Sequence, residues 1–277
     1  MIISRKEIVN LSAAIRRIID GHAIDLRDNL EGRLSMLKND IHTLSGRLNE
    51  QAANLQKEKA AMANTLADIS HQLKTPLTAM MVMVELLESA PPEKRTEFIS
   101  NLKQGLTQTE WLVNTLLKMA KLESGSAAFQ PVHIPASKLL DTALAPLQIL
   151  LDIQNQQVNL TGEANLLCDK NWTAEAVTNI IKNASEHSPA GSTIEVTAGA
   201  NPICSWLAVS DAGDGIRSPD IKKLFKRFSG SGKGIGIGLA LALAIMRGQN
   251  GDISVDGGGD SHGAVFTLKF YGAGKNI

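Results

Sequence analysis

LADISHQLKTPLTAMMVMVELL, the stretch from residue 66 to residue 87, carries the strongest structural signal in the chain. On a helical wheel at about 100° per residue seven of its apolar side chains fall within one arc, and His71 lies nearly opposite that arc. Thr75, four residues later, shares the exposed face with His71, and Gln72 stands to one side. The pattern predicts an amphipathic helix with an outward-facing histidine and an apolar stripe formed by Leu66, Ile69, Leu73, Leu77, Met80, Val84 and Leu87.

The same helix is expected to begin far upstream of the histidine. No proline occurs before Pro76, and from Leu30 onward apolar residues step by alternating fours and threes, which is the heptad pattern of a coiled coil. A long helix with one apolar stripe requires a partner helix. The sequence predicts one helix from about residue 30 into the histidine region, with a seam formed by Leu30, Leu34, Leu37, Ile41, Leu44, Leu48, Leu55 and Met62.

A helical hairpin is predicted downstream of the histidine. Pro91 and Pro92 cannot continue a helix, so they separate the first helix from a second one, predicted from Glu93 to about Glu123. In a monomer both helices would leave an apolar face exposed. We therefore expect a parallel homodimer whose hairpins form a four-helix bundle, in which the second helix contributes Ile99, Leu102, Leu106, Val113, Leu116 and Ala120.

The N-terminal region contains a shorter amphipathic stretch, which Gly21 and the polar residues 22–29 interrupt. The order of helix, connector and helix resembles a HAMP signal-relay module, in which Glu31 and Gly32 match an acidic and glycine pair. The first helix lacks the proline usual in that family, so a plain coiled-coil linker is the alternative. The apolar residues of this first stretch are Ile8, Leu11, Ile15, Ile18 and Ile19.

Beyond residue 126 the sequence changes to short β-like runs separated by helical patterns, which predicts a separate α/β domain. The strands are expected at residues 158–160, 193–197, 205–209 and 264–270. The predicted organisation is a signal-relay region, a helical hairpin domain and an α/β domain, over residues 1–60, 61–125 and 126–277.

Residues 66–79 resemble the H-box of the dimerisation and phosphotransfer domain of sensor histidine kinases. The resemblance implies that His71 is the phospho-acceptor and that Thr75 positions water when such proteins dephosphorylate their partner. A neutral imidazole nitrogen is a good nucleophile near neutral pH, which fits this role. Pro76 removes one helical N–H and is expected to bend the helix close to His71.

Gln72 departs from the pattern of that family. Most members carry Asp or Glu directly after the histidine, proposed as the base that takes its proton. An amide cannot accept that proton, so we expect slow autophosphorylation and an altered balance between kinase and phosphatase activities.

A second motif, AVTNIIKNASEHS, places Asn179 and Asn183 at positions i and i+4, on one face of a predicted helix. The segment resembles the N-box of the same kinases. The resemblance implies that Asn183 coordinates Mg²⁺, that Lys182 lies close to the phosphates of ATP, and that Asn179 borders the same site.

Two further segments resemble motifs that surround the adenine nucleotide in these kinases. The carboxylate of Asp211, at the end of a predicted strand, could accept a hydrogen bond from the adenine amino group, while Gly213 and Gly215 let the ring approach. The segment LFKRF, residues 224–228, resembles the phenylalanine box, in which Arg227 would contact phosphate.

A glycine-rich segment then leads into the helix-forming run LALALAI, so that free backbone N–H groups and a positive helix end can face phosphates. Lys233 is followed by glycine, which differs from a Walker motif, and no Rossmann spacing is present. The lid between Phe228 and Gly236 is expected to be short. The residues of this box assigned to ATP are Lys233, Gly234, Gly236, Gly238 and Leu239.

Together the four motifs resemble a sensor histidine kinase between residues 66 and 240. This implies a coiled coil and helical hairpin followed by an α/β sandwich of the histidine kinase and gyrase type. It also implies an enzyme that autophosphorylates His71 from Mg-ATP, passes the phosphoryl group to an aspartate of a response regulator, and is able to dephosphorylate it.

Two alternatives remain open. ATP-operated clamps such as gyrase, mismatch-repair proteins and heat-shock chaperones share the nucleotide domain but lack an H-box. A nucleotide-binding protein that acts mainly as a phosphatase or scaffold is the second alternative, which Gln72 and the short lid favour.

Composition narrows the classes of partner. Lys and Arg number 28 and Asp and Glu number 28, so there is no basic excess that would attract nucleic acid. Cys168 and Cys204 lack a C-x-x-C spacing, so neither a zinc site nor a disulfide is expected. No segment approaches about 18 consecutive apolar residues, which predicts a cytoplasmic chain with membrane attachment only through a part preceding this sequence.

Overall fold

The computed structural model of the chain describes residues 5–19, 33–89, 91–221, 223–228, 236–258 and 263–272. The predicted features outside these residues are the connector 21–29, the Glu31 and Gly32 pair, Lys233 and Gly234. The chain forms two compact units, Met1–His71 and Gln72–Ile277. Because their border falls within one helix, the three predicted domain boundaries stay predictions.

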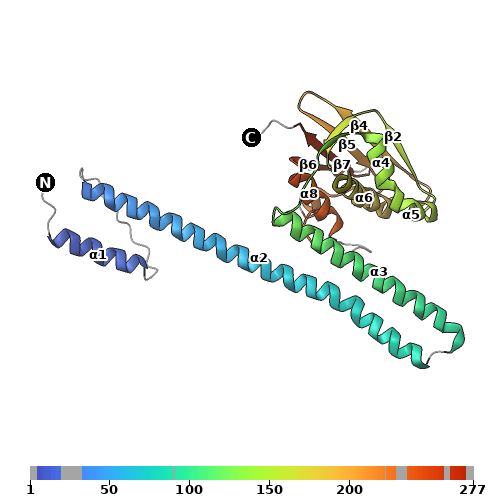
Figure 1. The fold of residues 1–277 in the computed structure, drawn as a ribbon, viewed down its shortest axis with the longest axis horizontal. Helices are drawn as coiled ribbons and strands as arrows, with labels where there is room; N and C mark the ends of the chain where they lie inside the picture. Colours follow the sequence, from blue (N-terminus) through green and yellow to red (C-terminus); the bar gives the residue numbers. More distant parts are fainter. Residues whose placement is uncertain are drawn as a thin grey trace. The chain divides into compact units, whose positions relative to one another are not determined.

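The first unit contains helix α1 (Arg5–Ile19) and the beginning of helix α2 (Arg33–Ser89) (Figure 1). The long helix predicted from the heptad pattern is thus confirmed. Leu11 of α1 is buried, whereas the seam of α2 is 48 to 66% exposed at Leu37, Leu44, Leu48, Leu55 and Met62. An apolar seam this exposed is a surface on which another helix can pack.

The second unit begins with the rest of α2 and with helix α3 (Pro92–Glu123). Pro91 has an extended backbone, and Pro92 occupies the first helical turn, where its missing N–H costs nothing. At the other end the Ser124 amide donates to the Ala120 carbonyl at 3.0 Å, and Gly125 adopts a φ of +66°. The predicted hairpin is therefore confirmed, with both ends explained by proline and glycine.

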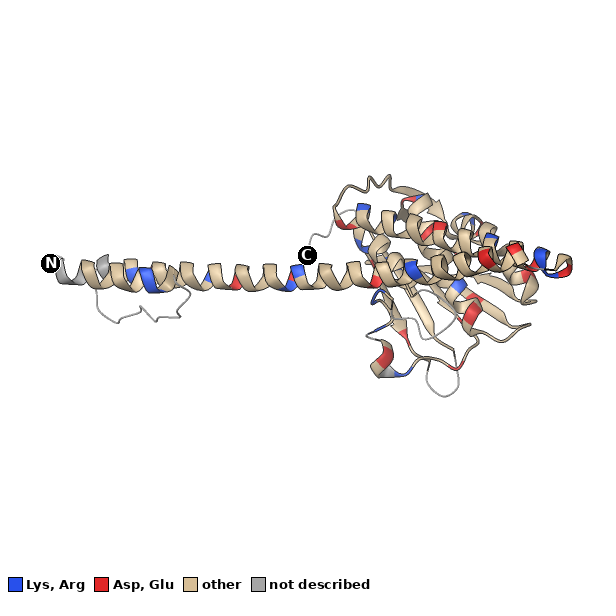
Figure 2. Cartoon of the chain, turned by 90° about the horizontal axis from the view of Figure 1, so that it is seen from below, with Lys and Arg blue, Asp and Glu red and all other residues tan. Residues whose placement is uncertain are grey.

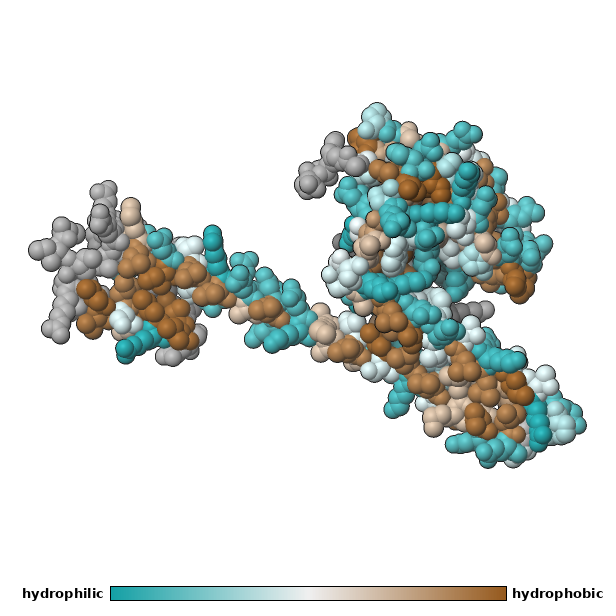
Figure 3. Space-filling view, in the orientation of Figure 1, coloured by the Kyte–Doolittle hydropathy of each residue, from teal (hydrophilic) through white to brown (hydrophobic). Residues whose placement is uncertain are grey.

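Helix α3 presents apolar side chains on two sides. Leu112, Thr115 and Met119 are buried. A second set of apolar side chains is 41 to 61% exposed, and its members are spaced by seven, seven and four residues. The set consists of Ile99, Leu106, Val113 and Leu117. Figure 3 shows hydrophobic surface along the hairpin formed by α2 and α3.

The remainder of the second unit contains a five-stranded sheet with the order β2-β4-β5-β7-β6. Strands β2 and β4 are parallel, and the other neighbours are antiparallel. A separate antiparallel pair joins β1 to β3. The strands are β1 (Val132–Pro135), β2 (Gln157–Thr161), β3 (Asn165–Cys168), β4 (Thr193–Ala200), β5 (Cys204–Ser210), β6 (Gly251–Asp256) and β7 (Val265–Tyr271).

Helices cover one face of this sheet, and alternate residues of β4 and β7 are buried beneath them. The core includes Ile180, Ile181, Leu241 and Phe266, all fully buried. The helical elements are α4 (Ala136–Leu144), the 3₁₀ turn η1 (Ala145–Leu147), α5 (Gln148–Ile153), α6 (Lys170–His187), α7 (Ser218–Ile221) and α8 (Gly238–Gly248).

Asp169 fixes the start of α6. Its Oδ1 accepts hydrogen bonds from the amides of Asn171 and Trp172 at 2.9 and 3.0 Å, which satisfies two N–H groups of the first turn. Its Oδ2 accepts from the Gln130 amide at 2.9 Å. One carboxylate therefore ties the segment after α3 to the helix that carries the N-box residues.

The predicted fold class is confirmed. The four expected strands are β2, β4, β5 and β7, whereas β1, β3 and β6 were missed. Both cysteines are free, and burial raises the pKa of the Cys168 thiol. Among the described residues no helix combines the length and hydropathy needed to span a membrane. Figure 2 shows acidic and basic residues interspersed along the helices.

Candidate active site

His71 and Thr75 lie on the exposed side of α2, one helical turn apart. Gln72 is half-buried, as expected for a residue at the edge of the apolar stripe. The helix continues without interruption past Pro76. Because proline has no N–H, the carbonyl of Gln72 lacks its helical donor. The bend expected near His71 stays a prediction. The predicted exposure of His71 is confirmed.

The N-box residues lie where α6 meets the start of α8. Asn179 is 9% exposed, and its Nδ2 donates to the Glu175 carbonyl at 2.8 Å. A Cβ added at Gly238 would lie 2.7 Å from Oδ1 of Asn179, so only glycine permits this approach. Asn183, one turn further along α6, is half-buried. The fold thus brings the N-box and the glycine box together from 59 residues apart (Asn179 to Gly238).

Asp211 directly follows β5 and is 8% exposed. Its Oδ1 accepts hydrogen bonds from the amides of Gly213 at 2.9 Å and Ala264 at 3.0 Å. The Ser188 hydroxyl accepts from the Ala212 amide at 3.0 Å and holds the same loop to the end of α6. Among the described residues, the amides of Gly213 and Ala264 both donate to Oδ1. The other carboxylate oxygen, Oδ2, can therefore accept a hydrogen bond from a ligand.

The backbone around Asp211 is packed too tightly for side chains. A Cβ at Gly263 would lie 2.0 Å from the Asp211 carbonyl oxygen and 2.3 Å from Oδ1. Gly213 approaches the His187 carbonyl in a similar way, at 2.5 Å. Gly215 has a φ of +73°, a conformation that glycine adopts most readily. Sequence reasoning found Gly213 and Gly215 but missed Gly263, because its partner lies 52 residues earlier.

The base of the lid is closed by one backbone hydrogen bond. The Phe228 amide donates to the Gly236 carbonyl at 2.9 Å, and both residues have positive φ angles, +58° and +73°. Phe225 and Phe228 pack against the core as anchors, and Leu239 in the first turn of α8 also packs there. Residues 229–235, which include Lys233 and Gly234, lie outside the described residues.

The two predicted phosphate-binding cations both contact α3. The Arg227 guanidinium pairs with the Glu123 carboxylate, and burial lowers its pKa. Lys182 places Nζ 5.3 Å from the centroid of the Trp111 ring and 3.9 Å from a carboxylate oxygen of Glu186. Sequence reasoning did not find these contacts.

The described residues fit a purine nucleotide. Asp211 offers one carboxylate oxygen in a loop held by the tightly packed Gly213 and Gly263, and Asn179 is buried against Gly238 at the N-terminal end of α8. A helix of this length presents N–H groups and a partial positive charge to an anion. No described cluster of three His, Cys, Asp or Glu side chains suits a metal ion. A metal here would depend on Asn183 together with ligand phosphates.

Comparisons with known proteins agree with this geometry. Residues 61–125 match the family model of the His Kinase A phospho-acceptor domain. Residues 168–272 match the model described as histidine kinase-, DNA gyrase B- and HSP90-like ATPase. The chain is 23% identical over 221 residues to the signal transduction histidine-protein kinase BaeS of Escherichia coli, an alignment that covers 79% of this chain and 47% of BaeS. It spans about half the length of the curated relatives it matches.

Two solved structures share the fold. The histidine kinase ThkA, in complex with the response regulator TrrA, superposes with a TM-score of 0.65 at 15% identity, over 80% of this chain and 65% of ThkA. ShkA in complex with AMPPNP gives a TM-score of 0.57 at 22% identity, over 77% of this chain and 47% of ShkA.

The fold and the two matched domains define an ATP-binding signalling protein with a helical phospho-acceptor. The chain belongs to the sensor histidine kinases of two-component systems. ATP-operated clamps, the first alternative, are excluded by the match of residues 61–125 to the phospho-acceptor domain.

The packing of Gly263 against Asp211 gives a test of the adenine site. Gly263→Ala is expected to displace the Asp211 carboxylate and to weaken ATP binding at least tenfold, because backbone atoms cannot yield to a contact of 2.0 Å. Gly272→Ala is the matched control, since a Cβ there meets nothing within 4 Å. Titration calorimetry with ATP measures both. Equal affinity of the two variants would contradict the placement of adenine beside Asp211.

Proposed function

We propose that the chain is an ATP-dependent protein-histidine kinase that phosphorylates its own His71 and transfers the phosphoryl group to an aspartate of a response regulator. One observation carries the proposal: a single chain holds an exposed helical histidine and a separate domain whose glycine and asparagine residues suit a nucleotide. The matches of both regions to family models support it. ATP as the donor assigns the reaction to the cytoplasm.

In the proposed reaction an unprotonated imidazole nitrogen of His71 attacks the γ-phosphorus of ATP. The bond between that phosphorus and the β–γ bridging oxygen breaks, ADP leaves, and the other ring nitrogen loses its proton. Mg²⁺ would neutralise charge on the phosphates when bound. Asn183 is the proposed metal ligand, and Oδ2 of Asp211 would accept a hydrogen bond from the adenine amino group.

The glycine box would complete the nucleotide site. Backbone N–H groups at Gly236 and Gly238 would donate to the phosphates. Leu239 packs against the core and anchors the start of the helix. Lys233 and Gly234 stay predictions on sequence grounds alone. The proposed site therefore draws its phosphate contacts from backbone groups and from the cations Lys182 and Arg227.

Gln72 makes the proposed kinase different from most relatives. Its amide can orient the His71 imidazole by a hydrogen bond but has no basic atom that could take the proton. General-base assistance is typically worth about 10² to 10⁴ in rate. Loss of the proton to water would then contribute to a slow autophosphorylation.

Dephosphorylation of the response regulator is a second proposed activity. Thr75 lies one turn from His71 on the exposed side of α2, where its hydroxyl could hold a water molecule against a phosphoaspartate. ThkA was solved with a response regulator bound, which supports a partner of the same class for this chain. A protein with a weak kinase and a retained phosphatase would fit the Gln72 substitution.

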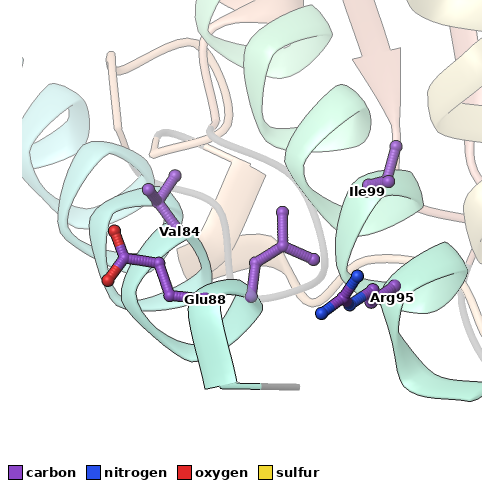
Figure 4. A pocket seen from close by; sticks show the side chains of 5 residues that line it. Val84, Glu88, Arg95 and Ile99 are labelled. Atoms are coloured by element: carbon purple, nitrogen blue, oxygen red, sulfur yellow. The ribbon is translucent and has the colours of Figure 1, made fainter. Parts of the chain in front are cut away.

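The matched phospho-acceptor domain implies dimerisation, and we propose a parallel dimer with a four-helix bundle. An open groove of about 460 Å³ lies between α2 and α3 near the hairpin turn (Figure 4). Val84, Leu87 and Ile99 line it with apolar atoms, and Glu88 and Arg95 complete its lining. A groove of this composition, continuous with the exposed stripe of α3, suits helices of a second copy.

The dimer is tested by light scattering at micromolar concentration. The expected mass is twice 29.6 kDa. Leu106→Glu places a charge in the centre of the exposed stripe and is expected to yield a monomer, whereas Leu106→Met preserves the dimer. A monomeric mass for the unchanged chain would rule out the bundle.

Single substitutions are expected to separate the phospho-acceptor from the ATP site. His71→Gln should abolish phosphorylation and leave ATP affinity unchanged, whereas Asn183→Ala should weaken Mg-ATP binding and reduce labelling together. Labelling with γ-phosphate-tagged ATP, followed by tests of acid lability and base stability, measures the first effect. Residual acid-labile label on the His71→Gln variant would move the acceptor elsewhere, with His187 the next candidate.

Gln72→Glu is expected to accelerate phosphorylation of His71, because a carboxylate restores the missing base at nearly unchanged volume. The gain should reach at most about 10² to 10⁴. Single-turnover labelling at saturating Mg-ATP compares the two proteins. Equal or slower labelling of the Glu variant would show that proton removal does not limit the rate.

A further inference from the structure

One side of α3 is part of the hydrophobic core of the nucleotide-binding domain. Leu112 and Met119 are 0% and 4% exposed and belong to the same cluster as the core residues of α6 and α8. Leu122 packs against this cluster from the last turn of α3. A Cβ at Gly248, the last residue of α8, would lie 3.6 Å from a methyl carbon of Leu122. Helix α3 and the domain therefore share a close apolar contact.

Charged contacts surround this apolar contact. Nζ of Lys118 lies 2.9 Å from a carboxylate oxygen of Glu175 on α6. Lys182, also on α6, lies over the ring of Trp111 with its ammonium 5.3 Å from the centroid. Arg227, just before the lid, pairs with Glu123 at the end of α3.

Two of these three cations are the ones to which phosphate binding has been assigned. Lys182 precedes the proposed metal ligand Asn183, and Arg227 precedes the lid by two residues. In the structure their charges face an indole ring and a carboxylate on α3. The carboxylate of Glu123 offers Arg227 the same bidentate acceptor geometry as a phosphate.

We infer that this contact is a self-inhibited arrangement, in which Trp111 and Glu123 of α3 compete with the phosphates of ATP for Lys182 and Arg227. The inference rests on the proposed function, since it concerns the regulation of the same nucleotide site. A movement of α3 that breaks both contacts frees two cations for ATP. Binding of ATP in turn favours release of α3 from the domain.

The size of the effect follows from linkage. If ATP binds fully only to the released form, its apparent dissociation constant equals the intrinsic value divided by the released fraction. An exposed cation–π contact of this kind changes such an equilibrium by about two- to fivefold. Because coupling between two sites is reciprocal, ATP favours the released form by the same factor. Helix α3 follows the helix that bears His71, so a change in the hairpin reaches the ATP site through this contact.

The test measures binding of AMPPNP with Mg²⁺ by titration calorimetry, in the full chain carrying His71→Gln so that no phosphoryl transfer occurs. Trp111→Leu removes the aromatic ring and keeps an apolar side chain. Glu123→Gln removes the charge at a side chain that is 55% exposed. Glu110→Gln removes an exposed charge of the same helix and serves as the matched control.

Trp111→Leu is expected to tighten AMPPNP binding about two- to fivefold. Glu123→Gln is expected to tighten it by up to about fivefold, whereas Glu110→Gln leaves it unchanged. Unchanged or weaker binding in both variants would overturn the inference. If Trp111→Leu fails to fold, as judged by thermal unfolding, Glu123→Gln alone decides, because its side chain lies outside the core.

Failure of the inference and failure of the proposed function give different results. If the parent binds AMPPNP and Asn183→Ala weakens that binding, the proposed nucleotide site is supported independently of the result for the α3 variants. If the parent shows no binding, both the proposed function and the inference are overturned.

Discussion

The rest of the structure depends on the packing of helix α6. Its residues Ile180 and Ile181 are fully buried beneath the sheet and fix the helix in the core. The same helix carries Asn179 to the start of α8 and Lys182 to the ring of Trp111. Because Asp169 anchors its first turn, α6 cannot move without disturbing the core. One rigid helix therefore supports the ATP site and the contact with α3.

This arrangement connects the two halves of the proposed reaction. The proposed phospho-acceptor His71 lies on α2, and the hairpin continues into α3, whose other side is buried in the nucleotide-binding domain. Autophosphorylation requires the domain to deliver the γ-phosphate of ATP to His71. In the inferred arrangement Trp111 and Glu123 hold the domain on α3, so release of the domain would precede phosphoryl transfer and would limit the reaction.

The sequence predicted the elements that its local patterns encode. The heptad pattern predicted α2, Pro91 and Pro92 predicted the hairpin, and four strands were predicted from short β-like runs. Strands β1 and β3 were missed because each has four residues and pairs only with the other, so they lack a periodic signal of useful length. Strand β6 contains glycine and two aspartates, which are depleted in strands.

Local motifs likewise predicted the candidate site residues but not their contacts. The carboxylate of Asp211 depends on the Ala264 amide and on the absence of a side chain at Gly263, and these residues come together only through the pairing of β5 with β7. Arg227 was predicted to contact phosphate, and the structure pairs it with Glu123, more than 100 residues earlier. No spacing within a motif carries information on such a partner.

The competition between α3 and ATP can be measured most directly at Met119, which is 4% exposed in the shared core. In a Cys204→Ser background, with Cys168 buried, Met119→Cys provides one thiol whose reaction with a maleimide reports whether α3 is covered. The account predicts that saturating AMPPNP with Mg²⁺ increases the labelling rate several-fold. An unchanged or slower rate with nucleotide would show that α3 stays in place when ATP binds, and would contradict the account.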